Sequence, residues 1–235
     1  MRAAVVVVTL GIAASACSVP DGARPAAPDQ STVSQGSQDG GLFSPLDLGF
    51  YEQPDRVQWQ KPEQIMDALG LADGSVVAEI GAGSGWFMIQ LARRVGPGGR
   101  VYAEDIQPPM IEVMKRRVQR ENLSNVTTIL GTANDPRLPH GLDVVLIVSV
   151  YGEMEDPVAL LENAARSLKP QGCIGVVDFI PGGGGPGPAP NERVDPDTVI
   201  EGASAAGLTL VARDTIPPFS YSLVFGTSAG ARCAR

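Results

Sequence analysis

From about residue 50 onward, short apolar runs alternate with longer amphipathic stretches. The apolar runs have strand length and show little polar alternation, which predicts strands buried on both faces, as in parallel sheets covered by helices. The predicted strands are Val76–Ile80, Val101–Asp105, Val126–Leu130, Asp143–Val148 and Cys173–Asp178.

The stretches between most of these runs have a helical pattern, and several begin with helix-capping chemistry. Asp156 and Asp195 each precede a proline, which predicts an N-cap followed by proline at the first helical position. The expected helices are Trp86–Val95, Pro109–Glu121, Pro157–Leu168 and Thr198–Ala206, after a short amphipathic helix that starts at Pro62 and ends at Gly70.

Two further strand-like runs, Leu208–Ala212 and Tyr221–Phe225, are expected to form a closing antiparallel pair. The fold class predicted is therefore α/β, a doubly wound, Rossmann-like, seven-stranded and mostly parallel sheet with an antiparallel closing strand. A proline- and glycine-rich segment, residues 181–190, begins where the fifth strand ends. It is either a lid over a ligand crevice or a flexible linker.

The first 17 residues are expected to be a signal peptide. Arg2 precedes an apolar stretch too short to span a bilayer comfortably, and the stretch ends in a lipobox-like Ala14-Ser15-Ala16-Cys17. The expectation is a bacterial envelope lipoprotein, anchored through a lipidated Cys17 on the periplasmic face. Ser18 favours the outer membrane by resemblance to Gram-negative lipoproteins. A plain secretory signal, or a cytoplasmic protein with a mis-assigned start codon, are the alternatives.

The remaining chain divides by composition. Residues 18–49 are rich in Pro, Ala, Ser, Gly, Gln and Asp and predict a disordered tether, followed by one domain over 50–226 and a flexible tail over 227–235. The formal net charge is −8, and the basic triplet at 115–117 fits a solvated helix face, so nucleic-acid binding is not expected.

Few residues are suited to holding a metal. The chain has three cysteines and one histidine, with no Cys-x-x-Cys pair, so no metal is expected. A disulfide between Cys173 and Cys233 is conceivable in an oxidising compartment, whereas a buried, inert thiol at Cys173 and a frayed tail at Cys233 are the favoured interpretation.

The segment with the most chemistry is Glu79-Ile-Gly-Ala-Gly-Ser-Gly85, between a predicted strand and a predicted helix. Glycines in such a turn allow backbone N–H groups and the helix N-terminus to approach a ligand. A dinucleotide fingerprint requires a third glycine where this chain has Trp86, which weakens the hypothesis of a nicotinamide-dependent oxidoreductase. Glu79 also suits a ligand that carries a positive amine.

This segment and four later ones resemble class I S-adenosylmethionine-dependent methyltransferases, of the small-molecule kind that includes ubiquinone-biosynthesis enzymes. The resemblance covers roughly residues 50–226, and its motifs occur in the family's order. They are Val77–Gly85, Gly99–Met110, Gly131–Asp135, Leu142–Tyr151 and Leu168–Gly172.

The resemblance implies S-adenosylmethionine as the methyl donor and assigns residues to it. Asp105 would accept hydrogen bonds from the ribose diol, and Glu79 would lie near the cofactor amino group, while Glu104 is the weaker acidic candidate. Ile106 would stack on the adenine. The other implied cofactor-binding residues are Gly81, Ala82, Gly83, Gly85, Thr132, Ala133 and Ser149.

The chain departs from the family at two of these motifs. Thr132 stands where relatives often carry aspartate, so its hydroxyl would replace one adenine contact. Gly152 stands where some relatives have histidine, which leaves Tyr151 or Glu153 as a general base, or as packing and capping residues. In-line methyl transfer needs little acid–base help.

Two aromatic residues, Tyr51 and Trp59, precede the first predicted helix and would either shield the sulfonium or, as favoured slightly, pack in the core. The resemblance predicts a methyltransferase for a small or lipophilic acceptor, its oligomeric state open. The main alternative is a non-catalytic envelope protein that binds adenosyl compounds, because the donor is made in the cytosol and an exported enzyme would have to find it outside.

Overall fold

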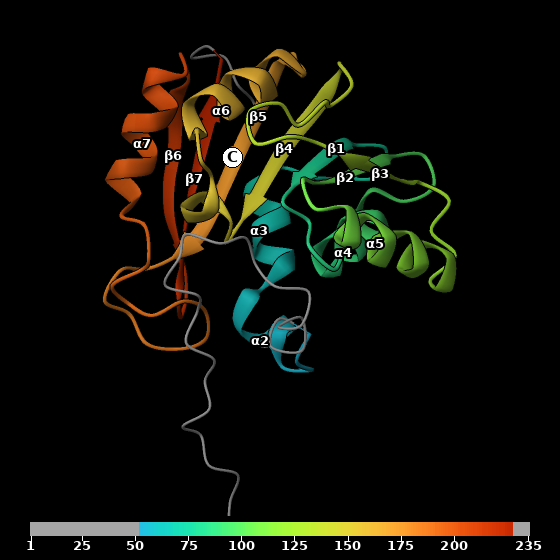
Figure 1. Cartoon of the computed structure of the whole chain (residues 1–235), viewed down its shortest axis with the longest axis horizontal. Helices are drawn as coiled ribbons and strands as arrows, with labels where there is room; N and C mark the ends of the chain where they lie inside the picture. Colours follow the sequence, from blue (N-terminus) through green and yellow to red (C-terminus); the bar gives the residue numbers. More distant parts are fainter. Residues whose placement is uncertain (1–51, 228–235) are drawn as a thin grey trace, which may run out of the picture. The chain divides into compact units, whose positions relative to one another are not determined.

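The computed structural model describes residues 52–227, which form one seven-stranded sheet with helices on both faces (Figure 1). The strand order is β3-β2-β1-β4-β5-β7-β6. The strands are β1 (Val76–Ile80), β2 (Arg100–Asp105), β3 (Val126–Leu130), β4 (Leu142–Val148), β5 (Leu168–Phe179), β6 (Thr209–Ile216) and β7 (Ser220–Gly226).

The strand directions confirm the predicted fold class and refine its closing part. Strands β1 to β5 pair in parallel, and β7 inserts between β5 and β6 and runs antiparallel to both. The two last strands form the expected antiparallel pair, in which β7 is the strand that runs against all the others and β6 runs in the same direction as β5. The strands β1 and β4 are almost wholly buried, as their apolar runs predicted, and β7 is buried as well.

Helices divide the core into two apolar clusters, one on each face of the sheet. Side chains of α3, α4 and α5 pack with one set of alternate strand residues, and those of α6 and α7 pack with the other set. The helices are α2 (Arg56–Gln60), α3 (Pro62–Ala68), α4 (Trp86–Val95), α5 (Pro108–Arg120), α6 (Pro157–Arg166) and α7 (Pro196–Ala205), with a short 3₁₀ turn over Tyr151–Glu153.

Local chemistry sets the helix starts. The side chain of Asp156 accepts a hydrogen bond from the Ala159 N–H at 3.0 Å, and that of Asp195 accepts one from the Asp197 N–H at 2.8 Å. Both aspartates are the N-caps that the sequence predicted. Among the α-helices of residues 52–227, α2 was not predicted, because it has five residues and is too short to show a helical period.

The proline- and glycine-rich segment after β5 is organised by one buried arginine. The Arg193 guanidinium donates to the carbonyl oxygens of Ile180, Gly183, Gly184, Pro186 and Pro188 at 2.9–3.3 Å. Its carbon Cζ lies 5.1 Å from the ring centroid of Phe179. The Arg193 side chain therefore holds this segment in a defined conformation, which argues against a flexible linker, and no residue of 181–190 lines the cavity described below.

The predictions for residues 1–51 and 228–235, which include the signal peptide, the tether, Tyr51 and the tail, lie outside the described residues. Within residues 52–227 no helix is long and apolar enough to cross a membrane. Cys173 is buried in β5 and is disulfide-bonded, which corrects the expectation of an inert thiol. The other two cysteines, Cys17 and Cys233, lie outside the described part of the chain.

Candidate functional site

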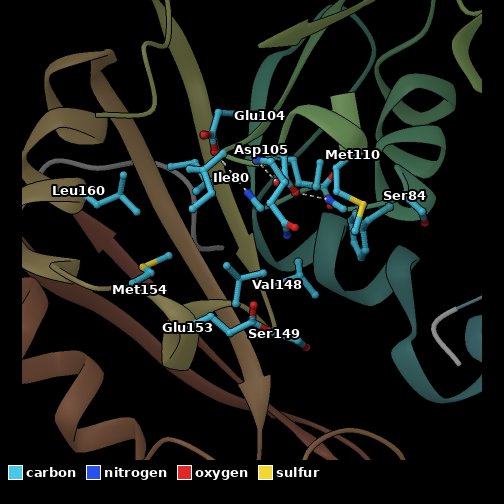
Figure 2. Close-up of a pocket in the computed structure, with 18 of the residues that line it drawn as sticks. Ile80, Ser84, Glu104, Asp105, Met110, Val148, Ser149, Glu153, Met154 and Leu160 are labelled. Carbon is cyan, nitrogen blue, oxygen red and sulfur yellow. Dashed lines mark hydrogen bonds between the residues drawn. The ribbon is translucent and has the colours of Figure 1, made fainter. Parts of the chain in front are cut away.

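A cavity of about 270 Å³ opens at the carboxyl ends of β1, β2 and β4. From β1 the chain continues to β2 and β3 on one side of the sheet, and from β4 it continues to β5 on the other side. Such a change of direction between neighbouring strands is the usual ligand position in doubly wound sheets. Ten of the twelve predicted site residues line it: Glu79, Gly81, Ala82, Gly83, Asp105, Ile106, Thr132, Ala133, Ser149 and Glu153. Figure 2 shows Met154 and Leu160 at one end, Ser84 and Met110 at the other, and Asp105 between them.

The turn after β1 requires glycine for two different reasons. Gly81 has φ +69°, and a Cβ there would lie 2.6 Å from Cγ1 of Val150, so the residue allows close packing against the end of β4. Gly83 has φ +55°, and a Cβ there would meet nothing within 4 Å. The open space beside Gly83 belongs to the cavity wall, where a ligand can approach the backbone.

Gly85, predicted to bind the cofactor, is not among the residues that line the cavity. It is the N-cap of α4, with φ +80°, and a Cβ there would lie 2.8 Å from Cε of Met88. Its function in the fold is to turn the chain into the helix.

Asp105 is the acidic centre of the site. Its Oδ2 accepts a hydrogen bond from the Gly83 N–H and its Oδ1 accepts one from the Gln107 N–H, both at 2.9 Å. Burial raises the pKa of Asp105, and these two backbone bonds act against that rise. Each carboxylate oxygen keeps a further acceptor position, so the side chain can still bind two ligand hydroxyls.

Glu79 is buried, and its Oε2 has no hydrogen-bond partner in the described structure. Burial raises the pKa of this carboxyl group to about 8, although the nearby positive charge of Arg56 acts in the opposite direction. A buried carboxyl oxygen without a donor is costly, and a ligand amine in the cavity would satisfy it.

Arg56 is a cavity-lining residue that the sequence reasoning missed. Its guanidinium carbon lies 4.2 Å from the ring centroid of Trp86 and 5.8 Å from that of Trp59. The signal in the sequence was the pair Arg56 and Trp59, spaced as neighbours on one helix face. Trp59 itself does not line the cavity and packs 6.0 Å from the Phe179 ring, as the core-packing alternative predicted.

Glu104, the residue before Asp105, also lines the cavity and points to the opposite face of β2 (Figure 2). Its side chain is 1% exposed, its Oε2 accepts from the Gly81 N–H at 3.4 Å, and its Oε1 has no partner in the described structure. Burial, and next the charge of Asp105, raise the pKa of Glu104 to about 8.

The end of β4 supplies two polar groups to the cavity. Ser149 adopts φ +55°, a left-handed conformation that is rare for serine, and its buried Oγ has no partner in the described structure. Glu153 lines the cavity and has a solvent-exposed side chain.

Tyr151, expected at the crevice, is not among the residues that line the cavity. It is 5% exposed within the apolar cluster of α6 and α7, and a Cβ at Gly202 of α7 would collide with its hydroxyl. The one histidine, His140, is also elsewhere, with Nδ1 2.9 Å from the Arg166 carbonyl oxygen. Among residues 52–227 no three acidic, cysteine or histidine side chains could jointly hold a metal ion.

Comparison with known proteins agrees with this arrangement. Residues 77–172 match the model of a family described as methyltransferase domain. A nocamycin O-methyltransferase of Saccharothrix syringae is 32% identical over 119 residues, which are 50% of this chain and 42% of that protein. A demethylmenaquinone methyltransferase of Geobacillus sp. is 30% identical over 119 residues, half of each chain. The chain thus spans half or less of the length of these curated relatives.

Among solved structures, a SAM dependent methyltransferase from Aquifex aeolicus superimposes with a TM-score of 0.74 and 25% identity, over 78% of this chain and 98% of that one. The chain therefore has the Rossmann-like methyltransferase fold, and its residues 77–172 are similar to a methyltransferase domain.

Proposed function

We propose that this protein transfers a methyl group from S-adenosylmethionine to a small or lipophilic acceptor. The observation that carries the proposal is the convergence of three features on one cavity: the open side of Gly83, the two-oxygen acceptor Asp105, and the unpaired Oε2 of Glu79. Each matches one part of an adenosyl amino acid.

The residues present fit this cofactor along its length. Asp105 would hold the ribose diol, because both of its oxygens retain an acceptor position. Glu79 would accept from the ammonium group, and Arg56 offers positive charge for the carboxylate at the same end of the cavity. The cofactor, when bound, supplies a methyl group already activated on a sulfonium.

The chain's own contribution to the reaction is mainly positioning. Holding donor and acceptor in line supplies much of the rate of a displacement at carbon. Val148, Met154 and Leu160 give one end of the cavity an apolar lining, which suits an acceptor with an apolar body. Glu153 is the cavity residue placed to take a proton from such an acceptor, since it is exposed and close to solvent.

Calorimetry with S-adenosylmethionine and its demethylated product tests the cofactor assignment. Wild-type protein should bind both, and Asp105→Ala should weaken both. Absence of binding by the wild type would overturn the proposal. Transfer of a radiolabelled methyl group into an envelope extract then separates an enzyme from a protein that only binds adenosyl compounds.

The location of the protein is part of the same proposal. An apolar stretch that ends at Cys17 supports export and lipidation, and a disulfide at Cys173 is in keeping with an oxidising compartment. Labelling cells with a radioactive fatty acid should mark the full-length protein, and Cys17→Ala should abolish the label. A full-length protein that stays in the cytosol without lipid would contradict this proposal and remove the difficulty of donor supply.

A further inference from the structure

Glu104 is a buried acidic side chain at the cavity that methyl transfer does not by itself require. Among the residues described, its Oε1 has no hydrogen-bond partner, and the side chain is 1% exposed. Folding has removed this oxygen from water without supplying a donor, which costs on the order of 1–3 kcal/mol. A ligand that donates a hydrogen bond would recover that cost.

The position of Oε1 indicates which part of a ligand would reach it. Glu79 of β1 would hold the amino group of the cofactor, and Asp105 of β2 would hold its ribose. The next strand in the sheet after β2 is β3. The base attached to the ribose would extend toward the turn after β3. Glu104 reaches the same turn, because a Cβ at Gly131 would collide with its Oε1.

The hydroxyl group of Thr132, which was also expected to contact the base, forms hydrogen bonds within its own turn. Its Oγ1 donates to the Asp135 carbonyl oxygen and accepts from the Asp135 N–H, each at 3.1 Å. The hydroxyl proton and one lone pair of Thr132 therefore serve the turn itself. Near the turn after β3, Glu104 can therefore act as the hydrogen-bond acceptor for the base instead of Thr132.

We propose that Glu104 positions the cofactor by accepting a hydrogen bond from the 6-amino group of its adenine ring. The inference rests on the proposed function, since it presumes an adenosyl ligand in the cavity. Glu104 is then a specificity-determining residue contributed by the opposite face of β2 from the ribose acceptor Asp105.

The electrostatics of the site favour an uncharged hydrogen-bond donor, rather than a cation, as the partner of Glu104. Asp105 is the next residue, and burial together with its charge keeps the Glu104 carboxyl group protonated in neutral solution. An uncharged carboxyl group attracts a cation weakly, and with its proton on Oε2, whose remaining lone pair accepts from the Gly81 N–H, Oε1 is the carbonyl acceptor. The aromatic amine of adenine is a neutral donor of this kind.

The test compares S-adenosylhomocysteine with its 6-deamino analogue, in which purine replaces adenine, by calorimetry. Wild-type protein should bind the adenine ligand about tenfold more tightly or better, the value of one hydrogen bond to a buried group. Glu104→Met has a similar length and no strong acceptor, and it should bind both ligands equally. Glu104→Gln retains a carbonyl acceptor and should keep the preference.

Each other outcome has a defined meaning. Equal binding of the two ligands by the wild type, or a preference that persists in Glu104→Met, would overturn the role of Glu104 and leave the methyltransferase proposal standing. Failure of the wild type to bind either ligand would instead reject the proposed function and this inference with it. If Glu104→Met does not fold, equal binding of the two ligands by the wild type would still overturn the proposal.

Discussion

The backbone N–H of Gly83 donates a 2.9 Å hydrogen bond to Oδ2 of Asp105, which joins the turn after β1 to the last residue of β2. The same carboxylate accepts from the Gln107 N–H at the start of α5. One side chain thus holds both walls of the cavity in place before any ligand binds, and this preorganisation lowers the cost of binding.

Replacing Asp105 with alanine should therefore weaken S-adenosylhomocysteine binding by about 100-fold. The reason is the loss of hydrogen bonds to two ribose hydroxyls, worth about 3 kcal/mol together when the acceptor is charged. Calorimetry measures the change, and Asp214→Ala on the exposed part of β6 serves as a control that should bind normally. Near-normal affinity of Asp105→Ala would place the ribose elsewhere.

Stability of the ligand-free protein should fall as the pH rises from about 5 to 8. Burial raises the pKa of Glu79 from 4.5 to about 8, so the folded state keeps a proton that the unfolded chain has released over this window. The stabilisation is complete below pH 4.5 and is lost toward pH 8, by up to about 1.4 kcal/mol per pH unit for one such group.

Glu79→Gln should reduce this slope, because an amide does not titrate. Unfolding by urea at several pH values measures it, and the raised pKa values of Glu104 and Asp178 will leave a smaller slope of the same sign. An unchanged slope in Glu79→Gln would show that Glu79 is ionised in the folded protein.

The two glycines of the turn should respond differently to alanine. Gly81→Ala places a Cβ 2.6 Å from Val150 Cγ1 at φ +69°, and should destabilise the protein by roughly 2–4 kcal/mol. Gly83→Ala meets no atom within 4 Å, so backbone strain of roughly 1–2 kcal/mol is the main cost, while ligand affinity falls because the methyl group enters the cavity.

Val150→Ala removes the side chain that Gly81→Ala strikes, so the double variant should recover part of the lost stability. Thermal and urea unfolding of the two single variants and the double variant give the coupling energy. Strict additivity of the two changes would contradict the contact between Gly81 and Val150.

Arg193→Ala should loosen the segment that follows β5. The guanidinium is 9% exposed and donates to five backbone carbonyl oxygens, so its removal leaves several acceptors unpaired at a cost of about 3 kcal/mol. Limited proteolysis should show faster cleavage within residues 181–190. Arg193→Lys should rescue little, because an ammonium group lacks the planar fork that reaches these carbonyls; cleavage at the wild-type rate would contradict this structural role.

Much of the fold followed from local pattern. The parallel strands were predictable as short apolar runs, and β1 and β4 are almost wholly buried, whereas the edge strand β3 is partly exposed. The caps Asp156 and Asp195 were predictable because aspartate is a favoured N-cap residue and proline is favoured at the first helical position. The position of β7 was not, since the pairing of β7 between β5 and β6 depends on contacts far apart in the sequence. Helix α2 was missed because five residues carry no period.

The sequence by itself determined the glycine turn, Asp105 at the end of its strand and hence the kind of domain, because these depend on residue type and spacing along one strand–turn–helix unit. Only the tertiary structure decided which polar groups meet at the cavity. Arg56 comes to it from a separate helix, Glu104 lines it with a carboxyl group that has an unpaired, buried oxygen, and Tyr151 packs in the core instead. Burial, side-chain direction and unmet hydrogen bonds arise when distant segments pack, and no local pattern encodes them.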